Sequence, residues 1–297
     1  MTSPLWERAT VVGCGLIGAS FALALKESGA CRRIAGWDTA PGVLAEALRA
    51  GVIDEADDAF VNGRVSASDL FYLAAPVGGI IDFLRECGPS LNTSATVTDA
   101  GSTKVEVCRA ARSHLPAGVL FVGGHPVAGS HLSGLAHARA DLFRGAPYVL
   151  TGHTGEGDER FEALFETLSA TGARVKLLTD VEHDRALALV SHLPQLLAST
   201  LAATVGGRAD AASLLELSGT GYRDMTRLAA SSWDMWRDIL ATNSTPVAEA
   251  LGAVIERLKV LRDELEGGGG AELSAALSLF EQAGASSMKG EGNDSDS

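Results

Sequence analysis

Three glycines near the start of the chain are spaced to bind the phosphates of a nucleotide. Gly13, Gly15 and Gly18 form a GxGxxG pattern that follows an apolar run and precedes a helix-like stretch. In this pattern the first glycine permits a tight turn, the second lets a pyrophosphate approach the backbone, and the third lets the helix pack closely on the strand. The N–H groups at the start of that helix, where Leu16 and Ile17 stand, would then face the phosphates.

An acidic residue follows the glycines at the distance found in dinucleotide-binding folds. Asp38 lies about 20 residues after Gly18 and directly after a predicted strand at 34–37. A carboxylate at this position binds the ribose hydroxyls and repels a 2′-phosphate. The sequence therefore predicts NAD rather than NADP as the cofactor. We interpret Arg32 and Arg33, which precede the strand, as solvated residues.

Polar side chains that could act on a substrate follow predicted strands or lie in predicted helices. Ser102 and His125 each come after a strand, and His192 and Gln195 lie in a helix. A neutral imidazole, whose ordinary pKa is about 6.5, accepts a proton from a hydroxyl group. An arginine holds a carboxylate through two parallel hydrogen bonds. An anionic substrate would need such a cation, because the protein itself is acidic.

Composition limits the classes of protein to consider. The chain has 297 residues, a hydrophobic content of 46% and a formal net charge of −13. These values predict a globular protein of two domains, and the charge argues against nucleic acid or an anionic membrane as a partner. The 4 cysteines are scattered and have no histidine at metal-ligand spacing, so we expect no metal site. Without a signal pattern or a run of about 18 apolar residues, we expect a cytoplasmic protein.

The first half of the chain must supply the elements that position these residues. Short apolar runs alternate with helix-like stretches, which is the pattern of βαβ units in a parallel sheet. Pro76 stops one of the apolar runs, and we include it among the cofactor-binding residues. The predicted strands are 9–12, 34–37, 70–75, 96–98, 119–122 and 147–150, and the predicted helices are 16–28, 41–50, 104–113 and 159–171.

The character of the sequence changes near Thr179. From there on it shows helical periodicity with few strand signals, and the predicted helices are 184–205, 209–217, 246–265 and 271–283. We therefore predict an α/β fold with a Rossmann-type parallel sheet domain over 1–178 and an all-helical domain over 179–285. The polar, acidic segment 286–297 is predicted to be a disordered tail.

Several longer motifs resemble those of the TyrA family of prephenate and arogenate dehydrogenases. They are DAGSTK at 99–104, GGHPVAG at 123–129, SHLP at 191–194, GYRDMTR at 221–227 and MWRD at 235–238, and they occur in family order after the glycine pattern and its acid. The resemblance covers roughly residues 9–265. GGHPVAG followed by SHLP and DMTR is far more specific than the glycine pattern alone.

The resemblance implies an NAD-dependent oxidative decarboxylation of prephenate to 4-hydroxyphenylpyruvate. His125 would then accept the proton of the ring hydroxyl, Ser102 would hydrogen-bond that histidine near the nicotinamide, and Arg227 would hold a substrate carboxylate. His192 would contact the substrate or shape its pocket. Gln195 stands where family members often have a second histidine, which leaves open whether the enzyme prefers the side chain of prephenate or that of arogenate.

Local features add three structural expectations. Ser102 is also suited to cap the helix that follows it, because serine at a strand-to-helix turn is favoured there. Pro194 lies inside a predicted helix and is expected to kink it. His183, like the other histidines outside the motifs, is interpreted as a surface or hydrogen-bonded residue.

Three alternatives remain open. The same reaction on arogenate would give tyrosine directly. A hydroxyacid dehydrogenase or ketoacid reductase could share the architecture, since one fold hosts several chemistries. A chain that binds NAD without catalysing a reaction could also keep the fold. In each case the long apolar faces of the helical domain, together with the family resemblance, predict a homodimer formed through that domain.

Overall fold

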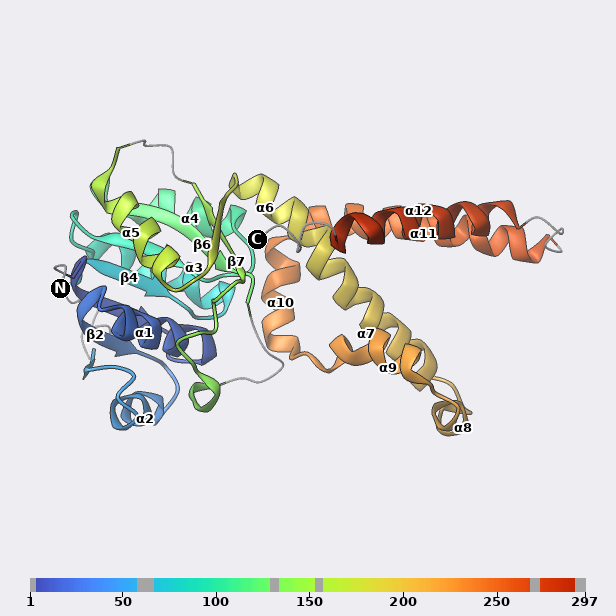
Figure 1. The fold of residues 1–297 in the computed structure, drawn as a ribbon, viewed down its shortest axis with the longest axis horizontal. Coiled ribbons are helices and arrows are strands. Elements are labelled where there is room, and N and C mark those ends of the chain that lie inside the picture. The colour runs from blue at the N-terminus through green and yellow to red at the C-terminus, as the bar shows by residue number, and fades with distance from the viewer. Residues whose placement is uncertain (1–3, 58–66, 129–133, 153–156, 268–272, 292–297) are drawn as a thin grey trace. The chain divides into compact units, whose positions relative to one another are not determined.

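A computed structural model describes residues 4–57, 67–128, 134–152, 157–267 and 273–291, with side chains described as far as residue 285. Two compact units are present, Met1–Ser244 and Thr245–Ser297. The first unit holds an eight-stranded sheet and helices α1 to α10, and the second holds the antiparallel pair α11 and α12 (Figure 1).

A mostly parallel sheet forms the centre of the first unit. Its strands lie in the order β3-β2-β1-β4-β5-β6-β7-β8, and of these neighbours only β6 and β7 run antiparallel. The strand order reverses between β1 and β4, which is where doubly wound folds bind their ligands. The bounds are β1 (Trp6–Val12), β2 (Cys31–Trp37), β3 (Glu55–Ala56), β4 (Leu70–Leu73), β5 (Thr96–Asp99), β6 (Leu120–Pro126), β7 (Pro147–Thr151) and β8 (Arg174–Leu177).

Helices cover both faces of this sheet. Phe21 of α1 (Leu16–Ser28) and Leu164 of α5 (Glu159–Ala170) belong to one buried apolar cluster. A second cluster contains Ile80 of α3 (Val77–Glu86) and Val107 of α4 (Val105–His114). Strands buried on both faces need to be apolar throughout, which is why β4 reads Leu-Phe-Tyr-Leu without alternation. Smaller helical elements are α2 (Val43–Arg49), η2 (Gly88–Ser90) and η3 (Leu135–His137).

A run of helices follows the sheet within the first unit. Helix α6 (Asp180–Leu187) starts with a capping box, in which the Thr179 side chain and Glu182 satisfy each other's backbone N–H groups. A π-helical turn, η4 (Ala188–His192), then leads directly into α7 (Leu193–Gly206), so the backbone irregularity expected from Pro194 lies just before it. The remaining elements are α8 (Ala211–Glu216), α9 (Thr220–Thr226), η5 (Arg227–Ala230) and α10 (Trp233–Thr242).

The predicted Rossmann-type sheet with a helical C-terminal region is confirmed, but some elements differ from their predictions. Strand β6 continues through Pro126, so His125 lies within a strand rather than after it. The sheet also gains β3, β8 and the antiparallel pairing of β6 with β7. Because β6 lies beside β7 in register from Gly123 to Pro126, the two strands share ladder hydrogen bonds that the sequence pattern alone does not reveal.

The compact units do not divide at residue 179. Helices α6 and α10 stay with the sheet, because Asp184 accepts hydrogen bonds from the start of α4 and Thr242 pairs with Thr103 at 2.8 Å. At the other end of the chain, the segment predicted to be disordered from 286 is helical as far as Glu291, where α12 ends. Residues 292–297 lie outside the described residues.

The segment Asp180–Gly206 is long and apolar enough to cross a membrane by length and composition. Two polar side chains in the middle of the segment are buried and hydrogen-bonded within the protein: His192 pairs with Asn243, and Gln195 pairs with Leu228. Core helices of water-soluble proteins satisfy the same criterion, and this segment belongs to the compact first unit. We therefore treat it as a helix of that unit.

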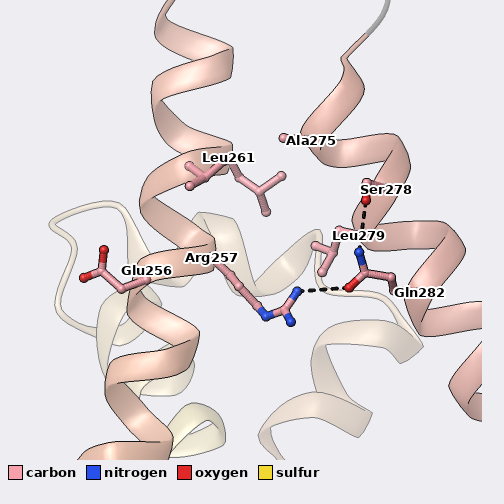
Figure 2. Close-up of a pocket in the computed structure, with 8 residues that line it drawn as sticks. Glu256, Arg257, Leu261, Ala275, Ser278, Leu279 and Gln282 are labelled. Carbon is pink, nitrogen blue, oxygen red and sulfur yellow. Dashed lines mark hydrogen bonds between the residues drawn. The ribbon is translucent and has the colours of Figure 1, made fainter.

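The second unit is a pair of helices, α11 (Ser244–Glu266) and α12 (Ser274–Glu291). The carboxylate of Glu264 accepts the N–H groups of Ala275 and Ala276, which fixes the start of α12. Figure 2 shows the groove of about 340 Å³ between the two helices, where Arg257 donates to Gln282 at 3.3 Å.

Candidate active site

The glycine turn excludes side chains at two positions and leaves room at the third. Gly13 has a φ of +93°, and a Cβ there would lie 2.8 Å from the backbone of Ala74. A Cβ on Gly18 would lie 1.9 Å from the carbonyl oxygen of Gly13. Among the described residues, apart from Gly15 itself, its chain neighbours and the backbone of its own helix, no atom lies within 4 Å of the position that a Cβ on Gly15 would occupy. Only Gly15 therefore faces open space, as expected for the glycine against which a pyrophosphate would rest.

Helix α1 begins at this turn without a side-chain cap. Gly15 is the N-cap residue and has no side chain, so the N–H groups of Leu16 and Ile17 are left for a ligand. The start of α1 thus offers both the open space beside Gly15 and the free backbone N–H groups of Leu16 and Ile17. This combination fits the phosphates of a dinucleotide.

Asp38 reaches the same turn from the end of β2. One carboxylate oxygen accepts the N–H of Cys14 at 2.8 Å, and the other accepts the N–H of Ala40 at 2.8 Å. Both bonds hold the half-buried carboxylate beside the glycines. Pro76 lies across the turn, exposed, at the start of α3 after strand β4. The predicted cofactor residues are therefore brought together at the carboxyl ends of β1, β2 and β4.

His125 lies near the end of β6, at the same edge of the sheet. The residue is 8% exposed, and its Nδ1 lies 2.7 Å from Nε2 of His183. Nδ1 of His183 lies 2.8 Å from a carboxylate oxygen of Asp184. Among the described residues, Nε2 of His125 has no hydrogen-bond partner. We call these three residues the His125–His183–Asp184 array.

The surroundings of His125 favour its neutral form. Burial lowers the pKa of His125 well below its ordinary value, and the positive charges that His183, Lys104 and His192 carry or can carry lower it further. The imidazole is thus neutral near pH 7. A neutral ring with an unpartnered nitrogen is the form that can accept a proton.

A buried ion pair holds the backbone that carries His125. Lys104 and Asp99 are both completely buried and paired with each other. The Lys104 ammonium also donates to the Gly124 carbonyl at 2.6 Å, while Asp99 accepts the N–H groups of Gly101 at 2.8 Å and Gly124 at 3.0 Å. A buried charge is tolerated only when it is paired and hydrogen-bonded, and here both conditions are met. These bonds fix the position of β6 immediately before His125.

Ser102 lies half-buried between Asp99 and Lys104, and it differs from expectation in two ways. Within the described part of the chain, no hydrogen bond joins it to His125, whose Nδ1 pairs with His183 instead. It does not cap α4 either. Lys104 is the N-cap residue, and Asp184 accepts the N–H groups of Lys104 and Val105.

His192 is buried in the π-helical turn before Pro194. The Asn243 amide donates to its Nδ1 at 3.1 Å and also to the carbonyl of Asp184 at 2.8 Å. Nε2 of His192 and Nε1 of Trp236 are buried, and neither has a partner among the described residues. The two rings meet edge to face, with centroids 5.8 Å apart. Burial lowers the pKa of His192 to about 4.

Gln195 and Arg227 lie on neighbouring elements. The Gln195 amide donates to the Leu228 carbonyl at 2.9 Å and accepts from the Ser231 hydroxyl at 3.2 Å, so α7 is tied to η5. Arg227 lies at the start of η5, exposed and without an ion pair in the regions that the structure describes. The Gln195 amide is thus occupied by the protein, whereas the Arg227 guanidinium is available to an anion.

Comparison with known protein families identifies the family to which this chain belongs. Residues 21–177 match the nucleotide-binding domain of prephenate dehydrogenase, and residues 179–279 match its dimerization domain. The chain belongs to the prephenate dehydrogenase family. The two matched regions meet where the predicted helical domain begins.

Individual members of the prephenate dehydrogenase family cover most of the chain. The prephenate dehydrogenase of Bacillus subtilis is 36% identical over 258 residues, which are 86% of this chain and 69% of the relative. The cyclohexadienyl dehydrogenase of Zymomonas mobilis is 31% identical over 87% of this chain and 88% of its own length. The prephenate dehydrogenase of A. aeolicus, solved with hydroxyphenyl propionate and NAD+, superimposes with a TM-score of 0.86 at 28% identity, covering 95% of this chain and 98% of that one.

The sequence did not predict His183, Asp184 and Asn243 as residues of the site. Of the two roles expected for His183, the hydrogen-bonded one holds, because the residue is completely buried and hydrogen-bonded to His125. Asp184 and Asn243 hold the two histidines His183 and His192 in place. The signal for Asp184 is weak, because an acidic residue in the first turns of a helix is common on electrostatic grounds alone. The described residues contain no group of three His, Cys, Asp or Glu side chains placed to hold a metal ion.

Proposed function

We propose that this protein is an NAD-dependent prephenate dehydrogenase, which converts prephenate and NAD+ into 4-hydroxyphenylpyruvate, CO2 and NADH. Family membership over both matched regions supports the assignment. The observation that carries it is the buried His125, whose Nε2 has no partner among the described residues, at the same sheet edge as an open glycine turn. A cofactor that lies along this edge would bring its nicotinamide toward β5 and β6.

Gly13, Gly15 and Gly18 would hold the pyrophosphate together with the N–H groups of Leu16 and Ile17. Asp38 would accept hydrogen bonds from the ribose hydroxyls, because its carboxylate faces the turn. Pro76 would line the same site. When bound, NAD+ accepts the hydride from the hydroxyl-bearing ring carbon.

His125 would accept the hydroxyl proton while the C–O bond gains carbonyl character. A general base in such a position contributes roughly 10²–10⁴ to the rate. The ring then loses CO2 and becomes aromatic, and the proton returns from His125 to the phenol oxygen. Aromatisation makes the overall conversion effectively irreversible.

The substrate carries two carboxylates, and the chain carries a net charge of −13, so local positive charge or N–H donors must attract it. Arg227 would bind one carboxylate, since its guanidinium has no ion pair among the described residues. The buried Nε2 of His192 would donate to a substrate oxygen. Ser102 would contact the substrate or nicotinamide, and Gln195 would act indirectly by holding η5.

Arogenate remains the second candidate substrate. A cyclohexadienyl dehydrogenase is among the relatives of this chain, and Gln195 does not supply the cation that a second histidine would. Initial rates with prephenate and with arogenate, each with NAD+ and with NADP+, would separate the possibilities. We expect the highest kcat/KM with prephenate and NAD+. A higher kcat/KM with arogenate would make arogenate the substrate. A preference for NADP+ would contradict the role proposed for Asp38 in binding the ribose hydroxyls.

We further propose that residues 179–285 form the substrate and dimerisation domain and that the protein is a cytoplasmic homodimer. The match of 179–279 to the dimerization domain of the family supports this proposal. The groove between α11 and α12 and their exposed apolar side chains, such as Phe280 at 75% exposure, offer a surface for a second copy.

A further inference from the structure

The buried His125–His183–Asp184 array connects the proposed base, His125, to a carboxylate through a second imidazole. His183 is completely buried, and each of its ring nitrogens has one partner, at 2.7 Å in His125 and at 2.8 Å in Asp184. Burying two imidazoles and a carboxylate is costly unless every polar atom has a partner. The two hydrogen bonds of His183 therefore join the three side chains into one fixed arrangement.

Asp184 fixes the first proton of the array. One of its carboxylate oxygens accepts the N–H of Lys104 at 2.7 Å, and the other accepts the N–H of Val105 at 2.9 Å. These donors belong to the start of α4, where the helix dipole also favours a negative charge. Both oxygens of Asp184 thus act as acceptors, so Nδ1 of His183 must carry the hydrogen that it shares with Asp184.

With His183 in its neutral form, the remaining protons follow from the first. A neutral His183 with hydrogen on Nδ1 has a lone pair on Nε2, which can only accept. Nδ1 of His125 must then donate to it, across the observed 2.7 Å. A neutral His125 with hydrogen on Nδ1 has its lone pair on Nε2, the nitrogen without a partner among the described residues.

We propose that His183, oriented by Asp184, is a positioning residue that sets the tautomer of His125, so that Nε2 of His125 is always ready to accept a proton. The inference rests on the proposed function only for the identity of the proton donor, the substrate hydroxyl. When that proton reaches Nε2, His125 becomes an imidazolium that still donates through Nδ1 to His183. No other bond changes, and the proton leaves Nε2 when the phenol oxygen takes it back.

Two substitutions at His183 separate the two hydrogen bonds. In His183→Gln, the amide oxygen replaces Nε2 and still accepts from His125, but Asp184 loses a donor. In His183→Asn, the shorter amide replaces Nδ1 and still donates to Asp184, but His125 loses its acceptor. Both variants replace the imidazole by a neutral amide and each keeps one of the two hydrogen bonds, so each is the control for the other, with Asn one methylene shorter than Gln.

The direct measurement is the ¹⁵N NMR spectrum of the full-length protein with ring-labelled histidine, in which His125→Asn identifies the His125 signals. The wild type is expected to show hydrogen on Nδ1 and a lone pair on Nε2, and His183→Gln to keep this tautomer. His183→Asn is expected to show a mixture of tautomers. A wild-type His125 with hydrogen on Nε2 would overturn the proposal, even if the variants failed to fold.

Kinetics provide the second readout. With prephenate and NAD+, His183→Asn should lower kcat roughly 10²-fold with little change in KM, because His125 is no longer held in the tautomer of a general base. His183→Gln keeps this tautomer, so its kcat should stay within roughly 10-fold of the wild type. Equal losses in the two variants would overturn the positioning role. A wild type that has the predicted tautomer but does not oxidise prephenate would instead contradict the proposed function alone.

Discussion

At the scale of single residues, His125 is distinguished from the other histidines by the state that its surroundings impose. Burial lowers its pKa, and His183 and Lys104 add to the effect, so a proton on Nε2 is held weakly and is returned readily. The buried Asp99–Lys104 pair fixes the backbone on which the imidazole stands. The site thus combines a neutral acceptor with a rigid support.

Replacing His125 by asparagine tests its role as the base. Asparagine keeps the approximate shape and can still bond to His183, but it cannot take up a proton. We expect kcat with prephenate to fall roughly 10²–10⁴-fold, while the affinity for NAD+, measured by fluorescence titration, stays unchanged. Full turnover in this variant would show that another group accepts the proton.

His192 makes the stability of the protein depend on pH. Its pKa is lowered from 6.5 to about 4 in the folded protein, so between these values the unfolded chain binds a proton that the folded protein does not. The free energy of unfolding therefore decreases as the pH falls through this range, by on the order of 3 kcal/mol. His125 contributes in the same direction.

Urea unfolding at about pH 7 and about pH 4.5 measures this dependence. The variant His192→Asn keeps an acceptor for Asn243 but does not titrate, so its stability should change less between the two conditions. A wild type that is as stable under the acidic condition would contradict the lowered pKa.

At the scale of elements, the turn between β1 and α1 contains one glycine that packing requires, Gly18, and one that faces the proposed ligand, Gly15. Gly18→Ala places a methyl group against the Gly13 carbonyl, which should destabilise the protein by about 1–3 kcal/mol or more. Gly15→Ala meets nothing within 4 Å, so this variant should fold with a normal melting temperature but bind NAD+ at least about 10-fold more weakly. Normal NAD+ affinity in Gly15→Ala would place the pyrophosphate elsewhere.

The sequence predicts this part of the molecule well because local rules determine it. The β1–α1 turn needs glycine for steric reasons, and the apolar run of β4 reflects burial on both faces, so both features are visible in the residue types. Asp38 is likewise found from its distance to Gly18.

The helical region and the site's supporting residues are less predictable. Asp184 caps α4 from 79 or more residues away along the chain, and His183 meets His125 from 58 residues away, so neither contact leaves a local pattern. The strand prediction ended β6 too early because Gly123 and Gly124 are poor strand formers. Glycine is needed at these two positions of β6, because Asp99, Thr98 and Thr151 leave no space for a Cβ.

At the scale of the whole molecule, the exposed apolar side chains of α11 and α12 require a covering surface. Leu258, Leu277 and Phe280 are 54%, 57% and 75% exposed, respectively, which is unusual for a monomeric protein in water when several such residues occur together. A second copy of the chain is the proposed cover.

Light scattering after size exclusion should therefore give the mass of a dimer at micromolar concentration. Phe280→Asp should shift the equilibrium toward the monomer, because an ionised carboxylate resists burial in an apolar interface. Phe280→Leu serves as the control and should remain dimeric. A wild-type monomer would contradict the proposed assembly.

The central claim is that one active site couples hydride transfer to decarboxylation. Simultaneous measurement of NADH and of CO2 during oxidation of prephenate by the full-length protein tests it most directly. We predict one CO2 for each NADH, with both products lost together in His125→Asn. Formation of NADH without CO2 would contradict the account and would point to a hydroxyacid dehydrogenase on the same fold.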